Sequence, residues 1–232
     1  MKGKELGILL DKHAYSESSS ILHFYTLEKG FQSFLYKGGL KKRKALNQLG
    51  LYELSCFKRP ESELGIVSQL DFAWTPQALF QRPQKVLLVF FMADVLKQTL
   101  RHQGPDPDLF QFIRDQLVRL ETTENAAQFP TQFLAKYLML LGYTPLIEVE
   151  QPQSFDLQKG SFDRASQTGI ACIQDPEVVS FLKAQFWPNY DQKWSSLCMK
   201  EGLKALIAYA EYHVAGFRLD KTMEILHDTL YD

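Results

Sequence analysis

The chain has 232 residues, of which 45% are hydrophobic and 23% are charged, and its formal net charge is −1. That composition is typical of a folded protein with one large or two small domains, and it excludes a disordered or collagen-like chain. The longest apolar stretch reaches only about half of a bilayer span, three scattered cysteines predict no disulfide framework, and the amino terminus carries no export signal, so we expect a cytoplasmic protein.

Residues 5–72 have the pattern of a small β-barrel. Short apolar runs rich in Ile, Phe, Tyr and Leu are separated by turn-forming residues, which is typical of short antiparallel strands. Gly30 marks a hairpin turn, because glycine adopts a positive φ without a steric penalty. The strands are predicted at Glu5–His13, Ser20–Leu27, Phe31–Lys37, Leu51–Phe57 and Gly65–Phe72. Five such strands fit an oligonucleotide-binding (OB) fold, and an SH3-like barrel with a similar set of strands is the alternative.

The pattern becomes helical after Thr75-Pro76. Apolar residues then recur every three or four positions, with Asp106 or Asp108 available to cap the second helix. Residues 154–168 lose this period and indicate a short hairpin or irregular insertion. The helices are predicted at Pro83–Arg101, Phe110–Leu120, Thr131–Leu141, Pro176–Phe186, Ser195–Val214 and Lys221–Leu230. The sequence therefore predicts an α+β protein, with an OB domain at 1–76 and a larger helical domain at 77–232.

No enzymatic motif is found in the sequence. It lacks a phosphate-binding glycine loop, a nucleophile elbow, an H-E-x-x-H motif and any C-x-x-C pair. No two of the five histidines lie three or four residues apart, so no helix presents two imidazoles to one metal ion, and His213 is expected to be structural. We therefore expect no catalytic residues, no bound metal and no cofactor.

The strongest functional signal is the basic run at residues 37–44. Residues 1–59 hold eleven Lys or Arg and five Asp or Glu, a net charge of +6, whereas the rest of the chain carries −7. The run follows two aromatic residues, Phe34 and Tyr36, which strand alternation is taken to turn outward. Exposed aromatic rings beside a cationic loop bind single-stranded nucleic acid, by base stacking and phosphate contacts. The predicted DNA-binding residues are Phe34, Tyr36, Lys37, Lys41, Lys42, Arg43 and Lys44.

The same region resembles a known family. The segments Tyr15–Leu22 and Tyr25-Thr26, then Gly30, Lys37-Gly38 and the basic run, are similar in order to the amino-terminal barrel of the bacterial recombination mediator RecO. Later segments resemble the helical domain of that family, namely Phe133-Leu134, Leu141-Gly142-Tyr143 and Tyr209–His213. Many members of the family carry a four-cysteine zinc site in the insertion, whereas residues 146–171 hold no cysteine here. The resemblance therefore points to a metal-free variant.

The resemblance implies a non-enzymatic mediator of recombinational DNA repair, in the cytoplasm and associated with the nucleoid. Such a protein binds single- and double-stranded DNA, anneals complementary strands and helps to load the RecA recombinase. The implied partners are RecR, the carboxyl-terminal tail of the single-strand-binding protein and, in some species, RecF.

Three alternatives stay open on the sequence. The basic run is the sort of segment that is often only a solvated loop. A protein-binding adaptor would keep the fold and use the run to bind an acidic partner tail rather than DNA. A small hydrolase or transferase without recognisable motifs would reveal itself by an acid–base pair in a pocket.

Overall fold

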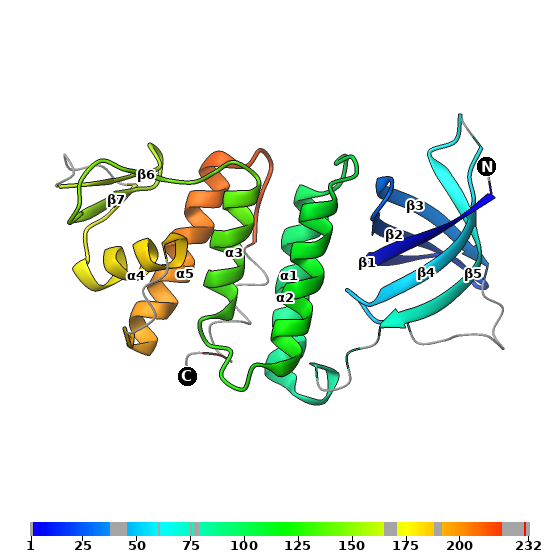
Figure 1. Ribbon diagram of the computed structural model, residues 1–232, viewed down its shortest axis with the longest axis horizontal. Coiled ribbons are helices and arrows are strands. Elements are labelled where there is room, and N and C mark those ends of the chain that lie inside the picture. Colours follow the sequence, from blue (N-terminus) through cyan, green and yellow to red (C-terminus); the bar gives the residue numbers. More distant parts are fainter. Residues whose placement is uncertain are drawn as a thin grey trace. The chain divides into compact units, whose positions relative to one another are not determined.

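The structure is a computed structural model, and it describes residues 2–37, 46–59, 61–74, 76, 79–164, 171–187, 192–219 and 230. Its amino-terminal part is a closed barrel of five strands, drawn in blue to cyan in Figure 1. The strands are β1 (Lys2–Ser16), β2 (Ser19–Thr26), β3 (Gly30–Lys37), β4 (Leu51–Phe57) and β5 (Leu64–Trp74). All five predicted strands are confirmed, and β1 is longer at both ends than its apolar pattern indicated.

Strand pairing identifies the type of barrel. The order around the barrel is β1-β2-β3-β5-β4, and β1 closes it by pairing with β4. Strands β3 and β5 run parallel, whereas the other four pairings are antiparallel. The expectation of a wholly antiparallel set was therefore wrong at this one pair, because side-chain alternation says nothing about strand direction. This order is that of the OB fold, which is thereby confirmed over the SH3-like alternative.

The interior of the barrel is a single apolar cluster. Its aromatic members are in edge-to-face contact, with ring centroids 6.2 Å apart for Phe24 and Phe34 and 5.9 Å apart for Phe24 and Tyr52. Such contacts add to the free energy that burial of the rings supplies. The buried members of the cluster are Leu9, Leu22, Phe24, Phe34, Tyr52, Leu54, Cys56, Val67 and Leu70.

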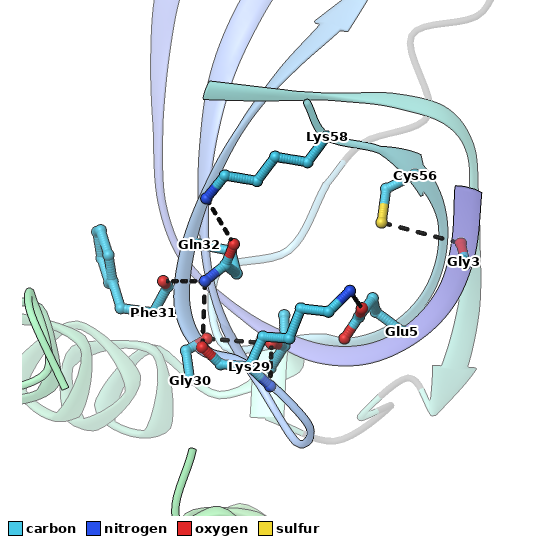
Figure 2. A network of polar contacts seen from close by, with 9 residues as sticks. Gly3, Glu5, Lys29, Gly30, Phe31, Gln32, Cys56 and Lys58 are labelled. Carbon is cyan, nitrogen blue, oxygen red and sulfur yellow. Dashed lines mark hydrogen bonds and ion pairs between the residues drawn. The ribbon is translucent and has the colours of Figure 1, made fainter. Parts of the chain in front are cut away.

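A polar network occupies one end of the barrel (Figure 2). The Lys29 ammonium, in the turn between β2 and β3, forms an ion pair with the buried Glu5 carboxylate of β1. The Gln32 side-chain amide donates to the Lys29 carbonyl at 3.1 Å, and its oxygen accepts from the Lys58 ammonium at 2.9 Å. These contacts join β1, the turn between β2 and β3, β3 and the residue that follows β4.

Among the described residues of the compact unit Met1–Thr123, two helices and a short 3-10 helix accompany the barrel. They are η2 (Leu79–Gln81), α1 (Pro83–Thr99) and α2 (Pro107–Thr122). Asp106 caps α2 as predicted, since its carboxylate accepts from the Leu109 amide at 2.9 Å. The Tyr25 ring of β2 stacks on Phe110 of α2, with ring centroids 6.3 Å apart. The last barrel strand ends at Trp74, and the predicted domain boundary at residue 76 stays a prediction.

In the part of the second compact unit, Glu124–Asp232, that the structure describes, there are three helices with given bounds and a small sheet. The helices are α3 (Phe129–Leu140), α4 (Pro176–Phe186) and α5 (Ser196–His213). The predicted insertion is a four-stranded sheet in the order β6-β8-β7-β9, with strands Leu146–Ile147, Ser161–Asp163, Ser154–Asp156 and Cys172–Ile173. His213, which is expected to be structural, donates from its Nε2 atom to the Leu157 carbonyl at 2.9 Å. Of the predicted last helix, only Leu230 lies within the described residues.

Candidate nucleic-acid interface

The basic run begins at the end of β3. Lys37 is the last residue of this strand, its side chain is exposed, and it lies opposite Ser19 of β2. Lys41, Lys42, Arg43 and Lys44 lie outside the described residues. The structure therefore places one of the five predicted cations, at an exposed strand end of the OB barrel.

Phe34 does not face outward, and that prediction was wrong. Only 2% of its surface is exposed, and its ring belongs to the core cluster of the barrel. A Cβ atom at Gly65 of β5 would lie 2.7 Å from this ring, so the ring fills the space that the glycine leaves. Tyr36 points to the same side and is partly buried against the same cluster. Alternation along the strand puts the side chains of residues 34 and 36 on the same face of β3. Barrel closure decides whether that face points to the interior or to solvent.

The outward side of β3 carries residues that sequence reasoning missed. Phe31 is partly exposed, and the His23 ring of β2 stacks on it with centroids 5.5 Å apart and planes 17° from parallel. The Nδ1 atom of His23 is 2.9 Å from the Ser33 hydroxyl. Burial lowers the pKa of His23, and the neighbouring His13 lowers it further. Side-chain alternation along β3 could have identified Phe31, if the outward-facing positions had been counted from Phe31 instead of from Phe34.

Charged side chains connect this face of the barrel to α1. Asp11 of β1 lies 3.0 Å from the Nε2 atom of His13 and 3.8 Å from the ammonium of Lys97. Lys97 also pairs with Asp94 one helical turn earlier, at 2.8 Å. The acidic and basic groups therefore alternate here, so the net positive charge of residues 1–59 is not concentrated at this junction.

A groove opens between the barrel and the helices that belong to the same compact unit. It has a volume of about 350 Å³ and lies between the middle of β1, residues 46–48, η2 and the first half of α1. Its lining residues are Leu9, Asp11, Lys12, Leu46, Asn47, Gln48, Phe80, Val86 and Phe90. Leu46 follows the basic run by two residues, so the groove is close to the run in sequence.

Among the described residues, no three His, Cys, Asp or Glu side chains are grouped so that they could hold a metal ion. Within those residues, Cys56, Cys172 and Cys198 are free. No helix in the part of the chain that the structure describes is both long and apolar enough to span a membrane.

An OB barrel at the amino terminus followed by a helical region defines a class of two-part α+β proteins. Two family models match this chain: "Recombination protein O N terminal" over residues 1–74 and "Recombination protein O C terminal" over residues 81–222. The chain therefore belongs to the RecO family.

Curated relatives named DNA repair protein RecO align with this chain over nearly its whole length. The chain is 26% identical to the DNA repair protein RecO of Christiangramia forsetii over 230 residues, which are 95% of this chain and 96% of the relative. It is 26% identical to that of Porphyromonas gingivalis over 239 residues, with 97% of each chain covered. It is 22% identical to that of Flavobacterium psychrophilum over 237 residues, 98% of this chain and 99% of the relative. The family is thus one of DNA repair proteins.

Proposed function

We propose that this protein is a non-enzymatic recombination mediator of DNA repair that acts in the cytoplasm, at the nucleoid. In this proposal it binds single- and double-stranded DNA, anneals complementary strands and helps to load RecA onto DNA coated with the single-strand-binding protein. RecR and the carboxyl-terminal tail of the single-strand-binding protein are the proposed partners, with RecF as a further one in species that have it. Membership of the RecO family supports this assignment.

The observation that carries DNA binding is that the basic run begins at an exposed strand end of the OB barrel. Lys37 ends β3 at an exposed position, and four further cations follow within seven residues in sequence, with no acidic residue among them. OB folds bind single strands through a positively charged groove that follows the phosphates and through rings on which bases stack. In our proposal Lys37, Lys41, Lys42, Arg43 and Lys44 contact phosphates. The stacking role proposed for Phe34 is withdrawn because its ring is buried, and Tyr36 keeps it only at its partly exposed edge.

The test is the salt dependence of binding to labelled single-stranded DNA. Five phosphate contacts release counterions and give a log–log slope of roughly −3.5, at about 0.7 per contact. The corresponding loss of affinity between about 50 and 200 mM salt is roughly a hundredfold. Replacing Lys41, Lys42 and Arg43 together with alanine should flatten the slope by about 2 and weaken all sequences alike.

A matched triple variant provides the control. Arg114, Lys159 and Lys193 are exposed cations outside the barrel, and their replacement by alanine removes the same charge. This control should bind with the wild-type slope. A run variant that stays folded and keeps the wild-type slope would mean that the run is only solvated. Titration with an acidic peptide separates the adaptor alternative, because an adaptor would bind the peptide and leave the DNA free.

A further inference from the structure

The groove that includes Leu46, two residues after the basic run in sequence, is lined by both apolar and polar side chains. Leu9 and Val86 contribute apolar side chains, whereas Asp11, Asn47 and Gln48 contribute polar groups. Its volume of about 350 Å³ lies in the range of sites that hold a small molecule or a single planar ring system. All of its lining residues belong to one compact unit of the chain, so the groove does not depend on how the two units are arranged.

Two phenylalanine rings lining the groove are unusually exposed. Phe80 of η2 is 38% exposed and Phe90 of α1 is 47% exposed. A single exposed apolar side chain on a protein surface needs no explanation. Two rings that line one groove and leave part of their surface uncovered supply a place where another flat ring can stack.

The groove lining holds polar groups that no described residue uses. The backbone of Asn47 is fixed, since its amide donates to the Tyr52 hydroxyl at 2.8 Å and its carbonyl accepts from the Gly50 amide at 3.0 Å. The side-chain amide of Asn47 has no hydrogen-bond partner among the described residues. The Nε2 atom of Gln48 donates to the Leu10 carbonyl at 2.9 Å, which leaves its Oε1 atom to accept. This hydrogen-bonded segment therefore presents both a donor and acceptors to whatever enters the groove.

The charges that line the groove favour a nucleobase over an acidic peptide. Asp11 and Lys12 both line the groove, so a peptide carboxylate would meet a carboxylate as well as an ammonium. A base has exocyclic amino groups that donate and ring nitrogens that accept, and it carries no charge. Leu46 follows Lys44 by two residues in the chain, so a strand whose phosphates contact the run would have its bases close to the groove.

We propose that this groove receives one unstacked base of a single-stranded nucleic acid. The base stacks on Phe80 and Phe90, and its edge hydrogen-bonds to the side chains of Asn47 and Gln48, as bases bound outside a stack are held in other proteins. The inference rests on the proposed DNA-binding function and adds to it a preference for unpaired bases. A closed duplex does not fill the groove, because its bases are stacked and paired.

The experiment measures binding of a thymidine oligonucleotide that carries one 2-aminopurine, with the intact chain at fixed salt. Phe80→Ala and Phe90→Ala should each weaken binding by about fivefold to a hundredfold, which is the range for loss of one stacked base. Both should reduce the change in 2-aminopurine fluorescence on binding, and both should leave the salt slope unchanged. Phe57→Ala is the matched control, because Phe57 is 40% exposed on β4 and does not line the groove.

Three further measurements make the test decisive. An oligonucleotide with abasic sites should bind the wild type and both variants equally, and so should a closed duplex. Asn47→Ala should weaken binding of the intact oligonucleotide as well, which keeps the test valid if truncation of a ring disturbs folding. The proposal is overturned if the variants bind the intact oligonucleotide as tightly as the wild type does. It is also overturned if they lose as much affinity for abasic DNA as for the intact oligonucleotide, or if they lose affinity for an acidic peptide and not for DNA.

The outcomes also separate this inference from the proposed function. If the groove variants bind the oligonucleotide like the wild type while the run variant loses salt-dependent binding, the proposed base site is refuted and the proposed DNA-binding function is supported. If no oligonucleotide binds the wild-type protein at any salt concentration, both are overturned.

Discussion

Gly30 lies directly against the backbone of Gly104. A Cβ atom on Gly30 would come within 2.3 Å of the Gly104 carbonyl carbon, and Gly30 has a positive φ of 66°. Two hydrogen bonds hold the same contact: the Phe31 amide donates to the Gln103 carbonyl at 3.0 Å, and the Tyr25 hydroxyl donates to the Gly104 carbonyl at 3.1 Å. The turn between β2 and β3 is therefore attached to the segment that joins α1 to α2.

Replacing Gly30 with alanine should destabilise the protein by roughly 3 kcal/mol or more, because a strained φ and a backbone clash add together. Urea denaturation measures the loss. Gly104→Ala tests the other side of the contact, since a Cβ there meets nothing within 4 Å and should cost far less. Gly142→Ala isolates the effect of a positive φ in open space, at about 1 kcal/mol. Equal effects at all three positions would refute the close contact.

Phe34→Ala should lower stability by about 3–5 kcal/mol, because it leaves a cavity in the barrel core. Phe57→Ala on the same barrel is the comparison, since its ring is exposed and should contribute much less to stability. Thermal and urea melts of both variants provide the measurement. If Phe34→Ala melted like the wild type but lost DNA binding, the ring would face solvent after all.

The ion pair between Glu5 and Lys29 predicts an asymmetric double-mutant cycle. Lys29→Met should lower the free energy of unfolding by roughly 2 kcal/mol, because it leaves a buried carboxylate without its cation. The partial exposure of Lys29 keeps this figure low. Adding Glu5→Gln to that variant should restore part of the loss, because a neutral amide is cheaper to bury than an unpaired charge. Additive losses in the urea midpoints would show that the two side chains do not interact.

Three buried tyrosines predict a loss of stability at alkaline pH. Burial is the main cause that raises the pKa values of Tyr25, Tyr52 and Tyr209 to about 12, from an ordinary value of 10.0. The unfolded chain thus ionises these phenols at lower pH than the folded chain does. Their stabilising contribution is complete below pH 10 and is lost as pH rises towards 12.

The measurement combines urea midpoints with tyrosinate absorbance across that pH range. The midpoint should fall as pH rises, and the absorbance of the three buried phenols should increase only together with unfolding. Tyr25→Phe should reduce the pH dependence, because it removes one of the three phenols and its hydrogen bond to Gly104. Ionisation of all tyrosines in one step, with the fold intact, would contradict the burial.

The helices were largely predictable because their signals are local. Asp106 caps α2, Pro176 begins α4, and Gly142 follows α3 with a positive φ of 87°, as expected for a residue that ends a helix. Each of these signals depends on residues within one turn of one another. The small sheet of the insertion was less predictable, since its edge strands β6 and β9 are two residues long and too short to show a period.

The sequence by itself determined the strands, the helices, the turn at Gly30 and the basic run, because these features depend on side chains that are neighbours in the chain. Only the tertiary structure decided that β3 and β5 pair in parallel, that Phe34 faces the core while Phe31 faces outward, and that Phe80 and Phe90 line a groove beside β1. The physical reason is barrel closure. It depends on pairings between segments far apart in the chain, and these pairings select which of two alternating faces is removed from water.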